Sequence, residues 1–141
     1  MKSKAKAVTP SCPCDSTLAY DDCCGRWHRL ADQQPDGASA EGLMRSRYCA
    51  YVLGLEPYLL ATWAPQTRPM NASIDNAGIK WLGLRVISSE TGSDNQQATV
   101  EFIARSRVNG KGQRHHEINH FERIDGQWFY VRGEVPLVSS R

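Results

Sequence analysis

Four of the five cysteines fall within thirteen positions near the amino end, as Cys12-Pro13-Cys14 and, after eight further residues, Cys23-Cys24. Two closely spaced thiolate pairs joined by a short loop can surround one tetrahedral Zn²⁺, with bonds of about 2.3 Å to each sulfur. A segment this short is too small to fold unaided, so the bound ion would supply its stability. The spacing therefore predicts a zinc site with four local ligands, Cys12, Cys14, Cys23 and Cys24, and a separate Cys49.

The residues around these cysteines favour that geometry. Pro13 fixes its own φ and keeps the backbone between Cys12 and Cys14 from becoming helical, which helps to present the two sulfurs together. Cys23 and Cys24 are neighbours and can serve one ion only if the backbone turns there. The start of a short helix would provide such a turn, and its positive end favours thiolates.

Disulfides, buried free thiols and a redox-active vicinal pair are the alternatives to a metal site. Disulfide frameworks need an oxidising compartment, whereas residues 1–10 have a charged start and no apolar stretch of the kind found in export signals. The odd number of cysteines also fits four thiolate ligands plus a separate Cys49 better than paired disulfides. We therefore expect a cytoplasmic protein that binds Zn²⁺.

The same stretch resembles the SEC-C motif through Cys12-Pro13-Cys14, Ser16, Tyr20 and Cys23-Cys24-Gly25. In that family the cysteines bind zinc, and in the SecA translocase the module docks on the chaperone SecB. The resemblance implies that residues 11–30 form a zinc knuckle that binds another protein.

The stretch also departs from the motif in two ways. Asp15 and Thr17 stand where the family has glycines. Positions where lysines are usual hold Leu18, Ala19, Asp21 and Asp22. The resemblance therefore implies the metal ligands without the basic docking face, and it names no partner.

Length and charge limit the remaining possibilities. With 141 residues, 40% hydrophobic and 23% charged, the chain suits one globular core with a small appendage. The net charge of +2 comes from residues 1–30, and the remainder carries equal numbers of each sign. Equal numbers of positive and negative residues in the body argue against nucleic-acid binding. Residues 1–10, expected to be a disordered leader, hold three lysines that could contact the ribosome or a nucleic acid.

After a linker at residues 31–38, the pattern predicts helices followed by strands. Ser39 is expected to cap a helix from Ala40 to about Leu53 that Gly54 ends, and a second helix covers residues 58–63. Strands are expected at residues 81–87, 98–105, 114–124 and 128–131, with glycine-containing turns between them. This order predicts an α+β body in which helices pack on one face of a curved antiparallel sheet.

Several segments of the body are similar to the YchJ family of uncharacterised bacterial proteins. They include the arginine-rich segment 43–51, Thr62-Trp63-Ala64-Pro65, Trp81-Leu82-Gly83-Leu84 and residues 126–131. That family joins an N-terminal SEC-C motif to a nuclear transport factor 2-like domain. The resemblance implies that residues 39–135 form such a cystatin-like domain, with a pocket between the helices and a cone-shaped sheet.

Candidate pocket residues are Arg45, Arg47, Tyr48, Trp63 and Glu117. Arg45 and Arg47 are two positions apart and point about 200° apart on a helix, so at most one can face the pocket. An arginine beside Tyr48 and Trp63 could hold a small anionic ligand while the aromatic rings cover its apolar part. Alternatively, the arginine pairs with a sheet carboxylate such as Glu101 or Glu117.

Alternation along the third expected strand separates its polar residues into two sets. His115, Glu117, Asn119 and Phe121 share one face, which Phe121 identifies as the core side. His116 and His120 share the other face, about 13 Å apart at their Cα atoms, which is too far for easy metal ligation by both. We expect these two histidines to face solvent.

The sequence contains no Gly-x-Ser-x-Gly turn, no phosphate-binding glycine loop and no visible nucleophile–base set. It favours a non-catalytic zinc-binding protein in which the knuckle is a docking or adaptor module and the body a scaffold. Small-molecule binding or catalysis in the body pocket is the main alternative. Association with the ribosome or a nucleic acid through the basic leader is a second alternative.

Overall fold

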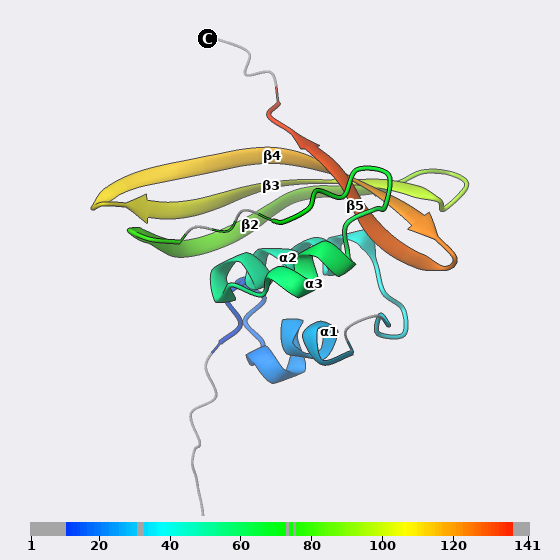
Figure 1. Cartoon of the computed structure of the whole chain (residues 1–141), viewed down its shortest axis with the longest axis horizontal. Helices are drawn as coiled ribbons and strands as arrows, with labels where there is room; N and C mark the ends of the chain where they lie inside the picture. Colours follow the sequence, from blue (N-terminus) through cyan, green and yellow to red (C-terminus); the bar gives the residue numbers. More distant parts are fainter. Residues whose placement is uncertain (1–10, 31–32, 73, 75, 137–141) are drawn as a thin grey trace, which may run out of the picture.

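The computed structural model describes residues 11–30, 33–72, 74 and 76–136. The expected leader, residues 1–10, and part of the expected linker lie outside the described residues. Two short helical segments near the amino end are followed by two helices and then by four strands (Figure 1). This order confirms the predicted α+β class.

The cysteine-rich segment forms a loop followed by η1 (Tyr20–Asp22) and α1 (Cys24–Leu30). The backbone N–H of Cys12 donates to the carbonyl of Leu18 at 2.8 Å, which closes the loop. The chain turns at Cys23, and α1 begins at Cys24, so the helix start expected at the vicinal cysteines is present.

The first helix of the body, α2 (Ala40–Leu53), has the boundaries expected from its capping residues. The Ser39 side chain accepts a hydrogen bond from the Gly42 N–H at 3.0 Å, and Gly54 takes the left-handed conformation with φ of 75°. The second helix, α3 (Glu56–Ala61), has Pro57 in its first turn and ends two residues earlier than expected.

The four strands are β2 (Ile79–Thr91), β3 (Gln97–Val108), β4 (Lys111–Ile124) and β5 (Gln127–Glu134). They form one antiparallel sheet in the order β2-β3-β4-β5. The turns at Asn109-Gly110 and Asp125-Gly126 have positive φ at both residues, as tight hairpin turns require. The strands extend beyond the predicted ranges because polar residues outside the apolar pattern also join the ladders, for example Glu90 opposite Thr99.

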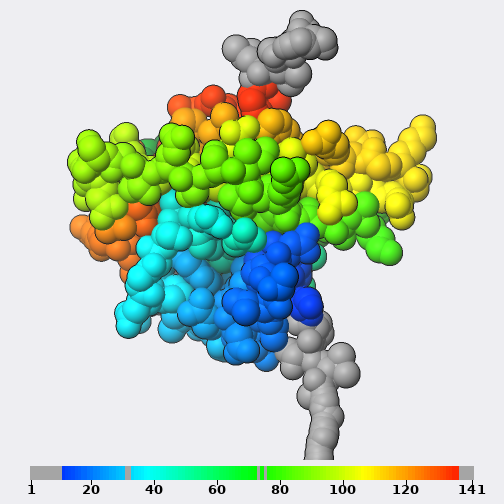
Figure 2. Space-filling model, turned by 180° about the vertical axis from the view of Figure 1, so that it is seen from behind, coloured from blue at the N-terminus to red at the C-terminus, as the bar shows by residue number. Residues whose placement is uncertain are grey.

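The molecule is layered. Helix α2 lies against one face of the sheet with α3 beside it, and α1 lies on the far side of α2 (Figure 1). The cysteine loop reaches the sheet through Asp15, whose carboxylate accepts from the Leu84 N–H of β2. Figure 2 shows the first described residues, coloured blue, in contact with the body. Cysteines of the loop, residues of α2 and residues of the sheet belong to one buried core. No described helix has both the length and the apolar character needed to cross a membrane.

Candidate functional site

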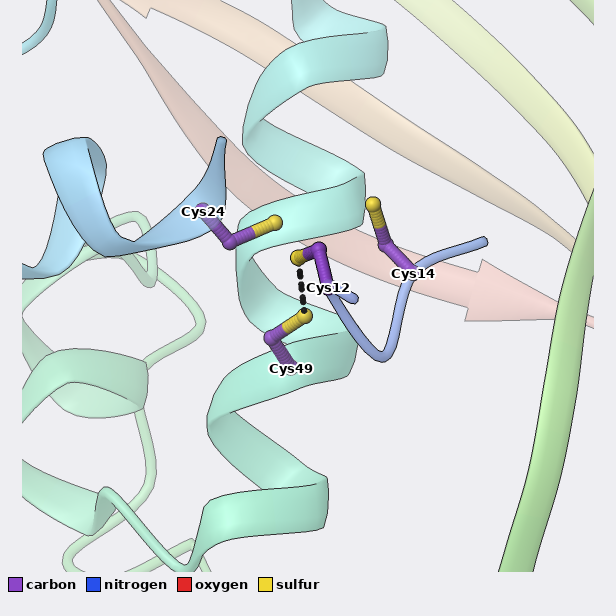
Figure 3. A group of neighbouring side chains, drawn as sticks. All are labelled: Cys12, Cys14, Cys24 and Cys49. Atoms are coloured by element: carbon purple, nitrogen blue, oxygen red, sulfur yellow. Dashed lines mark hydrogen bonds between the residues drawn. The ribbon is translucent and has the colours of Figure 1, made fainter. Parts of the chain in front are cut away.

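Four cysteine side chains converge at the junction between the N-terminal segment and the body. The Sγ atoms of Cys12, Cys14, Cys24 and Cys49 all lie within 4.8 Å of one another, and all four residues are buried. Figure 3 shows that they come from the N-terminal loop, the start of α1 and the middle of α2. The Sγ atoms of Cys12 and Cys49 are 3.4 Å apart although 37 positions separate the residues.

This group differs from the predicted set at one position. Cys23 lies at its edge, with its Sγ 3.6 Å from the Sγ of Cys14 and 3.0 Å from the Oγ of Ser16. Cys24 opens α1 and is buried, whereas Cys23 precedes the helix with φ of −128° and ψ of −112° and is only partly buried. Cys49, expected to stand apart, is buried and lies inside the thiol group.

The geometry of the group fits a tetrahedral metal ion. Bonds of about 2.3 Å place the sulfurs of a four-thiolate zinc site about 3.8 Å apart. The separation of 3.4 Å between the Cys12 and Cys49 sulfurs and the upper limit of 4.8 Å for the whole group lie within about 1 Å of that value. Thiolates prefer zinc to calcium or magnesium. Cys12, Cys14, Cys24 and Cys49 are the residues that would hold the ion.

Without a cation, the thiols of this group share their protons. Hydrogen bonds from Cys24 and then Cys49 lower the pKa of the Cys14 thiol. The same bonds with Cys14 raise the pKa of Cys24 and of Cys49. Four sulfurs this close cannot all be thiolates unless a positive charge lies among them, and a metal ion would supply that charge by replacing the protons.

The cysteine loop keeps the backbone shape that the glycines of the SEC-C motif favour. Asp15 and Thr17, which stand in place of those glycines, have φ of 64° and 73°. The Asp15 carboxylate accepts a hydrogen bond from the backbone N–H of Leu84 in β2 at 3.0 Å. A Cβ on Gly83 would lie only 2.5 Å from the Asp15 Oδ2 atom, so the glycine allows this approach.

Further contacts join the motif to α2. Trp27 is buried against Gly42, where an added Cβ would lie 2.6 Å from the indole ring. The His28 Nε2 atom is 2.8 Å from the carbonyl oxygen of Ser46, and burial lowers the pKa of His28. Arg45 donates to the carbonyl of Cys14 at 2.8 Å. The cysteine-rich segment is therefore held on the body by ring packing and hydrogen bonds as well as by its sulfurs.

The candidate pocket residues separate into three groups. Arg47, Tyr48 and Glu117 line a cavity of about 320 Å³ between α2 and the sheet. Arg45 faces the cysteine group, as expected for a residue two positions from Arg47. Trp63 stacks on the Arg47 guanidinium, with 5.1 Å between the Cζ atom and the ring centroid, and it is not among the cavity's lining residues.

Arg47 is tied to α3. Its side chain is 4% exposed, and its Nη1 atom donates to the carbonyl of Leu59 at 2.8 Å and to the Thr62 hydroxyl. The guanidinium also lies 4.4 Å from the centroid of the Tyr130 ring. Burial lowers the pKa of Arg47 to about 10, so it stays charged at neutral pH. These contacts replace the pairing with Glu101 or Glu117 considered from the sequence.

The alternation predicted along β4 is confirmed. His115, Glu117 and Asn119 line the cavity, and Phe121 is buried in the core. On the other face His116 contacts Glu101 at 2.7 Å and His120 contacts Glu134 at 2.9 Å. Other cavity walls absent from the predicted set are Tyr51, Trp81, Phe102 and Tyr130. Alternation along the strands could have identified Trp81, Phe102 and Tyr130, and helical spacing could have identified Tyr51, which lies three positions after Tyr48 on α2.

Comparisons with known proteins agree with this architecture. A family model described as the middle, NTF2-like domain of YchJ matches residues 39–133. A UPF0225 protein from Bordetella parapertussis is 48% identical over 134 residues, which cover 94% of this chain and 98% of that protein.

Two solved structures of SEC-C motif containing proteins have the same fold. The solution structure of one from Rhodopseudomonas palustris shares 36% identity and a TM-score of 0.76, covering 90% of this chain and 99% of that chain. The crystal structure of one from Psychrobacter arcticus shares 28% identity and a TM-score of 0.74, covering 92% and 85%. With its cysteine group, its nuclear transport factor 2-like body and these relatives, the chain belongs to the YchJ family of SEC-C motif proteins.

Proposed function

We propose that this is a zinc-binding protein in which the metal locks the SEC-C motif onto the body and the outer face of the motif docks on another protein. The ligands are Cys12, Cys14, Cys24 and Cys49. The single observation that carries the proposal is the convergence of these four buried sulfurs within 4.8 Å. Because Cys49 is on α2, the metal would connect the motif to the body. Four ligands from residues 12–24 would instead stabilise the motif alone.

A positive side chain lies next to the four cysteines, as suits a zinc ion with four thiolates. A zinc ion with four thiolates carries a formal net charge of about −2, which burial makes costly. Arg45 lies beside the site, where its Nη1 atom donates to the Cys14 carbonyl. Its Nε atom also forms an ion pair with Glu41 at 3.0 Å. A positive side chain at this place offsets part of the negative charge.

Exposed apolar residues of the motif support the docking role. Its inner side packs on α2, whereas Leu18 and Leu30 are 51% and 41% exposed on the outer side. The motif also exposes charges of both signs, with Arg29 3.6 Å from Asp21. Such a face suits a partner that combines an apolar patch with polar groups, rather than the acidic partner that a lysine-rich motif would bind.

Metal analysis of three proteins tests the ligand set. We expect the wild type to hold about one zinc per chain. Cys49→Ser should reduce zinc affinity by at least about 100-fold because a hydroxyl is a poor zinc ligand, whereas Cys23→Ser should keep the affinity within a few-fold. Competition with a chromophoric chelator measures both, and the absorption of the cobalt-substituted protein reports the number of thiolates.

Circular dichroism on each variant shows whether the fold survives. The ligand assignment is wrong if Cys23→Ser loses zinc and Cys49→Ser retains it. Equal loss in both variants would also contradict it, because it would require both sulfurs at the ion. A wild-type protein without zinc, purified under reducing conditions, would contradict the metal function itself.

The docking role needs a second experiment, in which cross-linking in cells followed by mass spectrometry maps partner contacts. We expect cross-links on the outer face of the motif that Leu18→Glu removes. Ile87→Glu is the matched control, because Ile87 is a similarly exposed apolar residue, 43%, on β2. Partner contacts that survive Leu18→Glu, or that map to the sheet and vanish in Ile87→Glu, would refute docking through the motif.

A further inference from the structure

The cavity between α2 and the sheet contains polar oxygens that lack partners. Its volume is about 320 Å³, and it is lined from α2 and from all four strands. The Asn119 Oδ1 atom is buried and has no hydrogen-bond partner among the residues that the structure describes. Within the same part of the chain, the Glu117 carboxylate forms no hydrogen bond or ion pair. Unpartnered buried acceptors cost free energy, which a bound donor would recover.

Asn119, Glu117 and the Tyr130 hydroxyl bring three oxygens close together on neighbouring strands. Asn119 on β4 is opposite Gly133 on β5. A Cβ added at Gly133 would lie 2.7 Å from Asn119 Oδ1 and 3.2 Å from both Glu117 Oε1 and the Tyr130 hydroxyl. The three oxygens therefore surround a place that glycine leaves open. One group with several N–H donors can reach them together from the cavity side.

The walls around this place are aromatic. Tyr48 and Trp81 contact each other edge to face with ring centroids 5.8 Å apart, and Phe102 and Tyr51 complete the apolar surface. Aromatic faces carry partial negative charge and attract cations within about 6 Å. The aromatic walls therefore favour a positively charged ligand, as the oxygens do.

The positive side chains near the cavity do not reverse this preference. The Nη1 atom of Arg47 is used on Leu59 and Thr62, and its guanidinium lies over the Tyr130 ring. The His115 Nε2 atom is 3.1 Å from the Ser106 hydroxyl. Arg47 keeps its charge and His115 acts on the Glu117 carboxylate through space, but neither forms a hydrogen bond or ion pair with it among the described residues. The Glu117 carboxylate therefore remains open to a cationic group, and the geometry favours a ligand opposite in charge to the anion expected from the sequence.

We propose that this cavity binds a small organic cation, a protonated amine on an apolar body. Glu117 is the counter-charge, Asn119 Oδ1 and the Tyr130 hydroxyl accept the other N–H groups, and Tyr48, Trp81 and Phe102 enclose the apolar part. A volume of about 320 Å³ suits a ligand of roughly a dozen heavy atoms. This site is distinct from the metal centre, so it stands or falls independently of the ligand cysteines.

Three probes of nearly equal shape and different charge test the proposal: phenethylammonium, 2-phenylethanol and 3-phenylpropionate. Binding is followed by NMR titration of the ¹⁵N-labelled full chain at neutral pH. We expect the cation to bind at least tenfold more tightly than the alcohol and the carboxylate. The shifted amides should lie on β4, β5 and the middle of α2.

Glu117→Gln keeps the size and shape of the side chain and should weaken cation binding at least tenfold. The matched control is Glu101→Gln, because Glu101 contacts His116 on the opposite face of the sheet, and it should leave cation binding unchanged. The thermal melting of each variant confirms folding. Equal affinity for the three probes, tighter binding of the carboxylate, no cation binding at millimolar concentration, or an unaffected Glu117→Gln variant would each overturn the proposal.

Discussion

Replacing Gly42 by alanine should destabilise this protein, although a glycine-to-alanine change within a helix is usually stabilising. Gly42 lies in the first turn of α2, where the motif packs on the body. An added Cβ would lie 2.6 Å from the Cζ2 atom and 3.3 Å from the Cη2 atom of Trp27. Trp27 is 6% exposed, so its ring has little room to move away.

Two opposing effects determine the size of the change. Alanine gains up to about 1 kcal/mol over glycine from helix propensity. Ordinary carbon–carbon contacts lie at about 3.5–4.0 Å, so the approach of 2.6 Å is about 1 Å too short. Overpacking of this kind costs about 1–3 kcal/mol, and we place this case near the upper limit. The net destabilisation is then about 1–2 kcal/mol, or about 3–8 °C in melting temperature.

Calorimetry on the metal-loaded protein measures this change. The same substitution in a Trp27→Leu background is the control, because the smaller side chain leaves space for the methyl group. There Gly42→Ala should be neutral or stabilising. If Gly42→Ala raises the melting temperature of the otherwise unchanged protein, Trp27 does not pack tightly on α2 and the docked position of the motif is wrong.

Other perturbations test the metal link, the buried arginine and the cavity carboxylate. Removing the metal with a chelator should shift the amide NMR signals of α2 around Cys49 as well as those of the motif. Unchanged α2 signals would indicate ligands confined to the motif. Arg47→Lys should cost about 2–4 kcal/mol in urea unfolding, because an ammonium group cannot reproduce the hydrogen bonds and ring stacking of the guanidinium. Burial raises the pKa of Glu117, although the charge of His115 partly opposes this effect. The stability that proton binding by Glu117 provides is therefore complete below its unfolded pKa of about 4.3 and is lost as the pH rises through the higher folded pKa. The stability of Glu117→Gln should depend less on pH in that window than the stability of the wild type. Urea midpoints measured from pH 4 to 8 test this, and equal pH dependence in the two proteins would contradict it.

Helix and turn boundaries were largely predictable because the residues that set them act locally. Ser39 caps α2 through its own side chain, and Gly54 ends the helix by adopting positive φ. The turns at Asn109-Gly110 and Asp125-Gly126 likewise depend on the residues at the turn itself. Strand ends were less predictable, because exposed residues such as Glu90 join a strand only when the neighbouring strand is long enough to pair with them.

In the cavity, too, some features follow from local sequence patterns and others only from packing. Alternation along β4 was sufficient to place Glu117 and Asn119 on the core side. The partner of Arg47 was not predictable, because the Leu59 carbonyl comes within reach only through the packing of α3 on α2. The charge that the cavity favours depends on which polar group is left without a partner, and that is a property of the packed structure.

By itself, the sequence determined that a thiol-rich motif precedes an α+β body, since cysteine spacing, caps, turns and alternation are all local patterns. The tertiary structure decided which sulfurs meet. It brought Cys49 from α2 to within 3.4 Å of Cys12 and left Cys23 at the rim. No spacing rule links residues 37 positions apart, because only the packing of the motif on α2 sets the distance between them.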